Sequence, residues 1–411
     1  MSLHASDDSS FTVETPFADS FRARDFRSAL LFKVARKLRK GRLRIETPGG
    51  ERLVVDSGVP GSEGHLKLHR WRALRRLLLG GDLGFAEAYI DGDWTSHDLT
   101  TMLELAAQNM EEIDATIRGS WPLRALNRLR HRRRRNSKRG SGRNISEHYD
   151  LGNDFYAEWL DPGMTYSSAI YADDSVSLEE AQAAKYRRVL DLLNLNGGER
   201  VLEIGCGWGG MAEALVGNRV GSLTALTLSR AQLDYTIKRL GRDDVDVQLT
   251  DYRDVTGSFD RIVSIEMLEA VGEENWPRYF EVLRQRLNDG GSAVLQAITI
   301  SDHRYESYRR GADYIQRHIF PGGMLPSPSI LKREIEHAGF TLTAVDTFGM
   351  SYAKTLAEWQ RRFQQSWPRI AGLGFPARFK RKWEYYLAYC EAGFRTGLID
   401  VGLYRIEKTR S

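Results

Sequence analysis

The ten residues from Val201 to Gly210, VLEIGCGWGG, constrain the fold more than any other segment of this chain. A short apolar run that contains one carboxylate precedes four glycines, which is the pattern of a strand whose end turns sharply. Glycine has no Cβ and tolerates positive φ, so the backbone can bend tightly and a ligand can lie directly against it. Helical patterns flank the turn, Ala181–Leu195 ending at Asn196-Gly197-Gly198 and Met211–Leu215, and a second strand-like run follows at Val220–Leu228. Together these segments predict a βαβ unit.

The spacing of the glycines separates this turn from other nucleotide-binding loops. The pattern E-x-G-x-G-x-G-G differs from the G-x-G-x-x-G of dinucleotide sites and lacks the Lys-Ser/Thr ending of a phosphate-binding loop. It is similar to the cofactor loop of S-adenosylmethionine-dependent methyltransferases. A glycine-rich turn without any ligand is the alternative, and the βαβ context makes it the weaker interpretation.

Length and composition limit the class of protein. A chain of 411 residues predicts two domains. No apolar stretch is long enough to span a bilayer, and the polar start MSLHASDDSS is not a secretory signal. The two cysteines, Cys206 and Cys390, are far apart in the sequence, so neither a disulfide framework nor a cysteine metal cluster is expected. We therefore expect a cytoplasmic enzyme without a bound metal.

The positive charge is concentrated in the first third of the chain. Residues 1–143 contain 27 Lys plus Arg and 18 Asp plus Glu, whereas the rest contains 32 and 37. The excess gathers in Phe21–Arg44 and in Arg124–Arg143, which has ten cations and no acid. The first stretch predicts an amphipathic helix with Phe26, Leu30, Val34 and Leu38 on one side, which suits an anionic membrane surface.

Two alternatives to membrane binding remain for these basic stretches. They can be a solvated helix face and a charged linker, which is the usual outcome for runs of charge. They can also bind nucleic acid, which we rank lower because no aromatic residues alternate with the arginines of the second stretch. We therefore expect no nucleic-acid partner.

Domain boundaries follow from these patterns. Strand-like LRIETP and ERLVVDS lie either side of Gly49-Gly50, and a helical stretch follows, so Leu43–Asp114 predicts a small mixed domain. We expect residues 1–120 to form a lipid- or substrate-docking domain, 121–143 a basic flexible linker and 144–411 a catalytic domain. A purely structural role for the first domain is the alternative.

Five further segments, together with the glycine turn, carry a resemblance that none of them carries alone. They are ISEHYDLGNDFYAEWLDPGMTYSSAIY at Ile145–Tyr171, LTLSRAQ, SIEMLEAVG, QAITI and FPGGMLPS. In this order they resemble the cyclopropane fatty-acyl-phospholipid synthase family, which includes the mycolic acid cyclopropane synthases. The resemblance is strong over residues 145–400 and looser before them.

The resemblance implies the fold and the cofactor. The expected fold is α/β, a class I methyltransferase (Rossmann-like) with a mostly parallel sheet and helices on both faces, plus a smaller N-terminal mixed α/β domain. The cofactor is S-adenosylmethionine (SAM), which binds at the carboxyl ends of the strands. The implied cofactor-binding residues are Gly205, Gly207 and Gly209 in the turn, Thr227, Leu228 and Gln232 after the second strand, Asp251 and Tyr252 beside the adenine, and Tyr166 and Ser167 over the other side. For Tyr166 and Tyr252, ordinary core packing is the alternative.

The resemblance also implies the chemistry. A cis alkene in a phospholipid acyl chain attacks the sulfonium methyl, and loss of a proton from the resulting cation closes a cyclopropane ring. In the family a bound bicarbonate removes that proton. Its implied holders here are Glu269, Tyr352, the amide of Ile298, and Ser168 and Gln296 in place of the usual Cys and His. Unlike imidazole, the Gln296 amide does not titrate.

Other assignments stay open. Glu266 is a second candidate for the catalytic carboxylate, and His318 is expected to be structural or to orient the substrate. If the cation loses a proton from a neighbouring chain carbon, the product is a methyl- or methylene-branched acyl chain. A catalytically silent lipid-binding protein and a small-molecule methyltransferase are further alternatives. The expected partners are unsaturated phospholipid and the anionic inner face of the membrane, with a homodimer left open.

Overall fold

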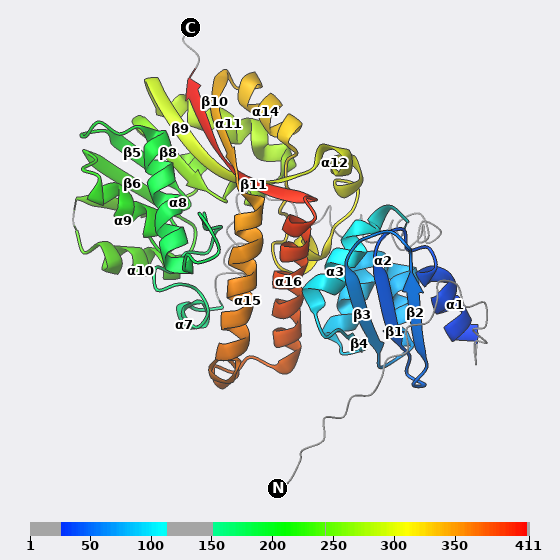
Figure 1. The fold of residues 1–411 in the computed structure, drawn as a ribbon. Helices are drawn as coiled ribbons and strands as arrows, with labels where there is room; N and C mark the ends of the chain where they lie inside the picture. Colours follow the sequence, from blue (N-terminus) through cyan, green and yellow to red (C-terminus); the bar gives the residue numbers. More distant parts are fainter. Residues whose placement is uncertain (1–25, 113–150, 243, 409–411) are drawn as a thin grey trace.

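The computed structural model describes residues 26–112, 151–242 and 244–408 (Figure 1). The predicted linker at 121–143 and the basic stretch Arg124–Arg143 lie outside these residues. Within the described ranges, no helix is both long enough and apolar enough to cross a membrane.

The N-terminal unit is a small sheet with helices packed against it. Its strands are β1 (Arg42–Glu46), β2 (Arg52–Asp56), β3 (Glu63–Leu68) and β4 (Trp94–Thr95), in the order β2-β1-β3-β4. Its helices are α1 (Phe26–Ala35), α2 (Arg72–Ile90) and α3 (Leu99–Gln108). The predicted hairpin around Gly49-Gly50 is present, because β1 and β2 pair antiparallel and Gly50 has a φ of 80°. The strands alternate between buried and exposed residues, as expected for a sheet with one covered face.

The predicted amphipathic helix over Phe21–Arg44 was wrong in its end and in its buried face. The helix α1 ends at Ala35, and Arg42 already begins β1. Ser28, Leu31 and Ala35 are its buried residues, whereas Phe26 is 79% exposed. The helix packs against the domain core through positions i, i+3 and i+7. Of the predicted side, Leu30 and Leu38 are half-buried against the same core, so the buried face is shifted from the predicted one and excludes Phe26.

The C-terminal unit is a seven-stranded sheet in the order β10-β11-β9-β8-β5-β6-β7. The strands β5, β6, β7, β8 and β9 pair parallel, while β11 pairs antiparallel with β9 and with β10. Their bounds are β5 Arg200–Ile204, β6 Ser222–Thr227, β7 Val245–Leu249, β8 Phe259–Ile265, β9 Leu287–Ile300, β10 Phe340–Thr347 and β11 Ile399–Lys408. This mostly parallel sheet between helices confirms the predicted class I methyltransferase fold.

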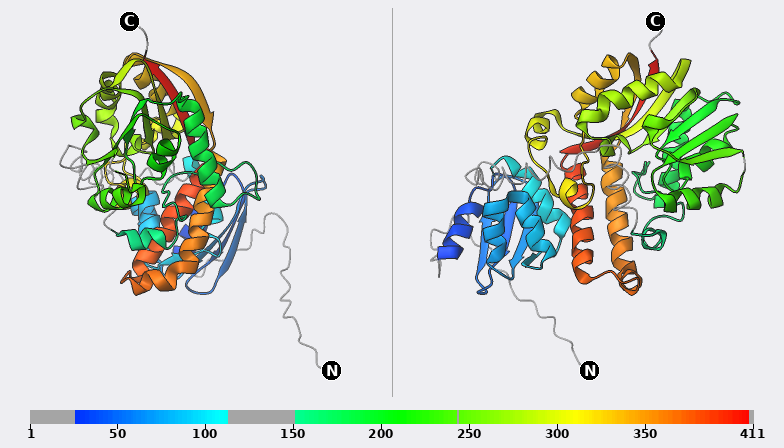
Figure 2. Two further views of the ribbon diagram at one scale, coloured as in Figure 1. Left: turned by 90° about the vertical axis from the view of Figure 1, so that its left-hand side faces the viewer. Right: turned by 180° about the vertical axis from the view of Figure 1, so that it is seen from behind.

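Helices cover both faces of this sheet (Figures 1 and 2). The long helices α15 and α16 project away from the sheet (Figure 1). The helices of this unit are α7 Asn153–Ala157, α8 Leu178–Leu193, α9 Gly210–Gly217, α10 Arg230–Leu240, α11 Trp276–Arg286, α12 Asp302–Tyr308, α13 Tyr314–His318, α14 Pro328–His337, α15 Gly349–Gly372 and α16 Ala377–Arg395. The helix α8 begins with a capping box between Ser177 and Glu180 and ends at Asn194, which adopts the left-handed conformation. The predicted βαβ unit is confirmed as β5, α9 and β6.

The long helices α15 and α16 join the two units. They pack against each other, and α16 also contacts α2 and α3 of the N-terminal domain (Figure 1). One cluster of buried apolar residues extends from Leu31 and Ile45 through Trp94 to Trp359 and Trp383. The two domains therefore share a continuous core, which places the N-terminal sheet beside the catalytic unit.

Candidate active site

The glycine turn after β5 has the backbone geometry that its sequence predicts. Gly205, Gly207 and Gly209 all have positive φ, at 83°, 53° and 84°. The backbone N–H groups of Gly205 and Cys206 donate to the carbonyl of Leu226 at 3.0 and 2.8 Å, which ties the turn to the end of β6. A Cβ on Gly209 would lie 2.8 Å from Cγ2 of Thr236. Glycine is therefore required at this point both for the φ angle and for space.

A cavity of about 1000 Å³ opens beside this turn. Most of the residues predicted to bind the cofactor line it: Gly205, Gly207, Thr227, Leu228, Gln232, Tyr252, Tyr166 and Ser167. The Thr227 hydroxyl donates to Oε1 of Gln232 at 2.8 Å, so these two side chains are held together at the end of β6.

Two predicted cofactor residues do not line the cavity. Gly209 lies behind the turn against Thr236. The carboxylate of Asp251 accepts from Nε of Arg253 at 2.8 Å and from Nη2 at 2.6 Å. Asp251 thus forms part of an ion pair at the start of the 3₁₀ turn Tyr252–Asp254, while its neighbour Tyr252 reaches the cavity.

Tyr166 is packed in the aromatic core and also lines the cavity. Its ring packs among aromatic neighbours, with Trp359 at 5.3 Å and Tyr156 at 5.3 Å between centroids. Its hydroxyl hydrogen-bonds to that of Tyr386 at 2.8 Å. Core packing therefore fixes the position of a ring that also lines the cavity.

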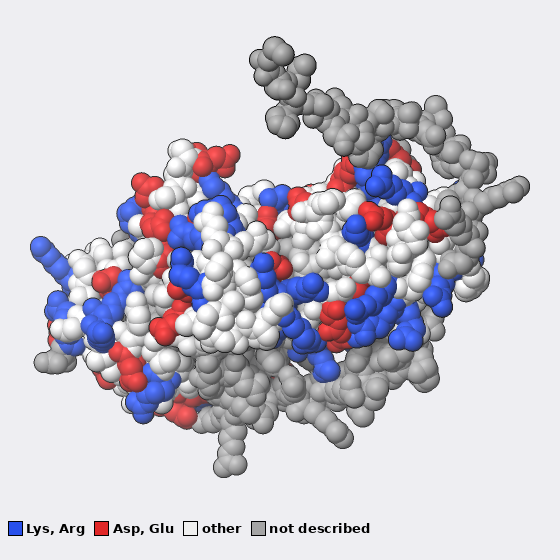
Figure 3. All heavy atoms as spheres, turned by 90° about the horizontal axis from the view of Figure 1, so that it is seen from below, with Lys and Arg blue, Asp and Glu red and all other residues white. Residues whose placement is uncertain are grey.

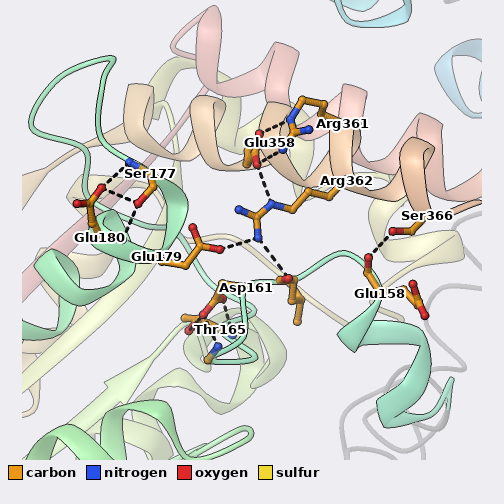
Figure 4. Close-up of polar contacts among 12 residues, drawn as sticks. Glu158, Asp161, Thr165, Ser177, Glu179, Glu180, Glu358, Arg361, Arg362 and Ser366 are labelled. Atoms are coloured by element: carbon orange, nitrogen blue, oxygen red, sulfur yellow. Dashed lines mark hydrogen bonds and ion pairs between the residues drawn. The ribbon is translucent and has the colours of Figure 1, made fainter.

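Polar contacts fasten the segment that carries Tyr166 to the helices around it (Figure 4). Arg362 of α15 bridges Glu358 at 2.7 Å and Glu179 of α8 at 2.9 Å. The buried carboxylate of Asp161 accepts from the backbone N–H of Thr165 at 2.9 Å, and burial raises the pKa of this carboxyl. The side chains of Arg362 and Ser366 in α15 also donate to the carbonyls of Leu160 at 3.4 Å and Glu158 at 2.6 Å, which ties the chain just before this segment to α15.

Two buried carboxylates face the cavity where β8 ends. Glu266 follows β8 with a φ of 48°, and Glu269 lies in the 3₁₀ turn Leu268–Ala270. In Glu266, Oε1 accepts from the backbone N–H of Ser168 at 2.8 Å and from the amide of Gln296 at 2.7 Å. Its Oε2 accepts from the Tyr352 hydroxyl at 2.7 Å. Glu266 is thus the carboxylate that gathers three donors.

This arrangement corrects the predicted grouping around Glu269. Oε1 of Glu269 accepts from the backbone N–H of Ile298 at 2.5 Å, and none of the side-chain donors around Glu266 bonds to it among the described residues. Its Oε2 is buried and has no hydrogen-bond partner among the described residues. Ser168 and Gln296 do not line the cavity, because Glu266 lies between them and it. The sequence offered no signal for this choice, since both glutamates sit in the same motif.

The donors expected to hold bicarbonate are therefore occupied by the protein's own carboxylates. A second anion placed against Glu266 and Glu269 would be repelled, and no donor of the predicted set is left to compensate it. The residues present do not fit a bound bicarbonate in this geometry.

Burial controls the protonation of the pair. Burial and, to a lesser extent, the charge of the neighbouring Glu266 raise the pKa of Glu269 to about 8. Burial also raises the pKa of Glu266, but the hydrogen bonds from Tyr352, Ser168 and Gln296 oppose this. The donors favour charge on Glu266, so Glu269 is the member that holds a proton at neutral pH.

Two further charged residues of the site were missed from the sequence. Glu203, the carboxylate of VLEIGCG, lines the cavity, and burial raises its pKa to about 8. Lys185 of α8 is buried and donates to Oγ of Ser167 at 2.7 Å, and burial lowers its pKa to about 8. A carboxylate inside an otherwise apolar strand, and a lysine on the apolar side of a helix, were the signals that could have found them.

The polar residues of the FPGGMLPS region have structural partners. Asp313 caps α13 in a capping box with Gln316. His318 lies 3.5 Å from the carboxylate of Glu87 in α2, so it links the catalytic unit to the N-terminal domain. Among the described residues, no cluster of His, Cys, Asp and Glu side chains is arranged to hold a metal ion.

Comparisons with known proteins agree with this fold. The model of the mycolic acid cyclopropane synthetase family matches residues 136–403. Tuberculostearic acid methyltransferase UfaA1 of Mycobacterium tuberculosis is 39% identical over 82% of this chain and 81% of its own length. The cyclopropane-fatty-acyl-phospholipid synthase of Escherichia coli (strain K12) is 36% identical over 82% of this chain and 85% of its own. The crystal structure of mycolic acid cyclopropane synthase CmaA1, complexed with SAH and CTAB, has a TM-score of 0.61 at 32% identity and covers 65% of this chain and 98% of its own.

Proposed function

Because this chain belongs to the mycolic acid cyclopropane synthetase family and is a SAM-dependent methyltransferase, we propose that it methylates a cis double bond in the acyl chain of an unsaturated phospholipid. The observation that carries this proposal is the pair Glu266 and Glu269, which lines an otherwise mainly apolar cavity beside the glycine turn. A carboxylate there is suited to take a proton from a hydrocarbon cation, a task that heteroatom methylation does not require.

The cofactor residues follow from the cavity lining. The turn at Gly205 and Gly207 lets the methionine part of SAM approach the backbone, and Thr227 with Gln232 offers polar groups to the ribose. Glu203 offers a carboxylate to the ammonium of the methionine part. When bound, SAM supplies an electrophilic methyl group on a positive sulfur.

Glu266 is the proposed proton acceptor. The alkene π electrons would form a bond to the methyl carbon while the bond from that carbon to the SAM sulfur breaks. The electrons of the broken bond would stay on the sulfur of the departing S-adenosylhomocysteine, and a cation would remain on the adjacent chain carbon. A C–H bond next to that cation then breaks, its electrons quench the cation and the proton passes to the Glu266 carboxylate. Tyr352, Gln296 and the amide of Ser168 orient that carboxylate and keep it ionised. The apolar lining excludes water that would otherwise trap the cation.

Two products share this first step, and each has an observation in its favour. Loss of the proton from a neighbouring chain carbon yields an unsaturated methyl-branched chain. A methylene branch forms if a 1,2-hydride shift first moves the cation to the methylated carbon and the methyl group then loses the proton. This outcome is supported by Glu266 and Gln296, which replace the expected ion and His, and by the relative named a tuberculostearic acid methyltransferase. Loss of a proton from the transferred methyl gives the cyclopropane, which is supported by the Escherichia coli relative named a cyclopropane-fatty-acyl-phospholipid synthase.

Incubation with methyl-¹³C SAM and a monounsaturated phospholipid tests the proposal. We expect label in the lipid, and NMR of the extracted acyl chains separates a ring carbon from a branch carbon. Label in a small molecule, or no transfer to lipid, would contradict the proposal in favour of a small-molecule methyltransferase or a silent lipid-binding protein. Repeating the assay in bicarbonate-free buffer and with added bicarbonate tests the role of Glu266, since we expect equal rates.

We also propose that the protein meets its substrate at the cytoplasmic membrane surface. On the face drawn in Figure 3, the described Lys and Arg side chains alternate with Asp and Glu around an uncharged area. Because the two signs of charge alternate, that face should not attract an anionic membrane strongly. The exposed cations Arg27, Lys33 and Arg36, on and just after α1, are the described group that best suits anionic lipid.

A further inference from the structure

The cavity beside the carboxylates continues into the N-terminal domain. Apolar side chains on β1, β3, α1 and α3 line it there: Leu31, Leu43, Ile45, Leu66, Met102 and Leu105. All of them are buried and belong to the core of that domain. Protein cores are normally filled to the density of organic crystals, and a void among apolar side chains is destabilising. An apolar hollow that joins a catalytic cavity therefore points to a hydrocarbon occupant.

The helix α16 is the wall that the two parts of the cavity share. Its residues Tyr385, Tyr386 and Tyr389 line the cavity between the catalytic unit and the N-terminal domain, and α16 contacts α2 and α3 (Figure 1). Tyr386 also bonds to Tyr166 of the cofactor site at 2.8 Å. The hollow of the N-terminal domain is thus connected to the carboxylates along one helix.

Polar groups line the cavity where the domains meet. Among them are Asp82 of α2 and, from the catalytic unit, Arg304, Arg310 and Asp313. Lys37, Asn109 and Glu112 add polar groups on the N-terminal domain. The helix α13, which Asp313 caps, contacts α2. Burial raises the pKa of Asp313 to about 7, and Asp82 on the facing segment contributes in the same direction. Charged groups of both signs therefore lie between two apolar ends.

This division matches the shape of a diacyl lipid, in which two hydrocarbon chains meet at a polar glycerol and head group. We propose that the N-terminal domain binds the second acyl chain of the lipid whose first chain is methylated at Glu266. The polar part of the lipid then lies at Arg304, Arg310 and Asp82. This inference rests on the proposed function and gives the docking role predicted for residues 1–120 a definite form. A lipid with one chain would leave one apolar end unfilled.

Filling the hollow tests the inference. Met102 is 6% exposed, and Met102→Trp adds a ring inside the N-terminal domain. We expect the wild type to show a KM for diacyl phosphatidylglycerol about tenfold lower than for the matching monounsaturated lysophospholipid, since burial of one chain is lost. Met102→Trp should raise the KM for the diacyl lipid to that for the lysophospholipid, and SAM affinity, measured by calorimetric titration, should stay unchanged. Val54→Trp, at a 57% exposed position, is the matched control. Equal KM values for the two lipids in the wild type, or an equal loss on both in Met102→Trp, would overturn the inference.

A cross-linking experiment on the wild-type protein does not depend on that variant folding. The probe is a phosphatidylglycerol with the double bond in one chain and a terminal diazirine in the other, saturated chain. Cross-links to peptides containing Leu31, Met102 or Leu105 support the inference, and cross-links confined to the catalytic unit overturn it. N-terminal cross-links without methyl transfer would retain the lipid site and reject the proposed function. Methyl transfer without N-terminal cross-links would support the proposed function and reject the lipid site in the N-terminal domain.

Discussion

Glu266 and Glu269 are two carboxyl groups in one buried site, and they have different tasks there. At low effective dielectric, a second negative charge close to the first is costly, so one member of the pair stays protonated. Glu266 has three hydrogen-bond donors, whereas Glu269 has the single backbone N–H of Ile298. The hydrogen bonds therefore favour the ionised state on Glu266, the proposed base, and Glu269 with a pKa of about 8 is its neutral neighbour.

Replacing each glutamate by glutamine separates these tasks. Glu266→Gln removes the proton acceptor and should lower kcat by about 10²- to 10⁴-fold, the usual contribution of a general base. Glu269→Gln replaces a neutral acid by a neutral amide that still accepts from Ile298, so kcat should stay within about tenfold at pH 7. Calorimetric titration should show unchanged SAM affinity for both variants. The opposite order of kcat losses would return the catalytic role to Glu269.

Tyr352 controls the pH dependence through its bond to Glu266. Its hydroxyl stabilises the ionised carboxylate, so Tyr352→Phe should raise the pKa of Glu266 still further above its ordinary value. A hydrogen bond to a charged group contributes about 1.5–3 kcal/mol, or about 1–2 pH units. The acid limb of the pH profile of kcat/KM, where the value rises as Glu266 ionises, should move to higher pH by that amount. Tyr305→Phe removes a hydroxyl bonded to Glu273, away from the cavity, and should leave the profile in place. An unchanged acid limb in Tyr352→Phe would show that Glu266 does not govern it.

Among the elements, the turn between β5 and α9 depends on glycine at a position that does not touch the cavity. At Gly209 the φ of 84° strains any residue with a Cβ, and that Cβ would press on Thr236 of α10. Gly209→Ala should therefore destabilise the fold by about 1–3 kcal/mol and weaken SAM binding by displacing Gly207. Thermal unfolding and calorimetric titration measure the two effects. Gly217→Ala, at a position where an added Cβ meets nothing within 4 Å, should not weaken either property.

Features set by residues close in the sequence were predicted correctly, whereas features set by tertiary contacts were not. The turn, its flanking helices and the hairpin at Gly50 follow from residues close in the sequence, and all of them are present. The buried face of α1 depends on which side meets the N-terminal core, and apolar spacing alone selected Phe26 wrongly. The choice of Glu266 over Glu269 depends on a left-handed residue and on Tyr352, which lies 86 positions away. Neither factor leaves a signal in the motif SIEMLEAVG.

At the scale of the whole molecule, the two predicted domains are coupled by α16. Glu391 is 3% exposed and accepts from Thr100 of α3 at 3.0 Å, while Nη2 of Arg395 lies 2.6 Å from its carboxylate. The sequence predicts a domain boundary but not this contact, because it joins residues 291 positions apart. The shared core and this buried carboxylate indicate that the domains unfold together.

Replacing Arg395 should make the free energy of unfolding depend more strongly on pH. Burial already raises the pKa of Glu391, and Arg395 opposes the rise, so Arg395→Ala should raise the folded-state pKa further above that of the unfolded chain. At pH 8 the free energy of unfolding of the variant should be about 1–3 kcal/mol lower than that of the wild type, because the charged carboxylate of Glu391 has lost a partner. The loss should shrink as pH falls and Glu391 takes up a proton. Thermal unfolding from pH 8 to pH 5 measures it, with Lys332→Ala in an exposed ion pair as control. A pH-independent loss would assign the effect to packing.

If α1 is the element that docks on the membrane, binding should depend on the cations on and just after α1 and not on the net charge of the whole protein. Each Lys or Arg near an anionic surface contributes about 1 kcal/mol, so the double variant Lys33→Gln/Arg36→Gln should weaken binding to phosphatidylglycerol vesicles by about 30-fold. Arg230→Gln/Lys238→Gln removes the same charge from exposed positions on α10 and should have little effect. Since salt screens exposed charges, the difference between the two variants should narrow as ionic strength rises. Cosedimentation measures both trends, and equal losses in the two double variants would reject α1 as the docking element.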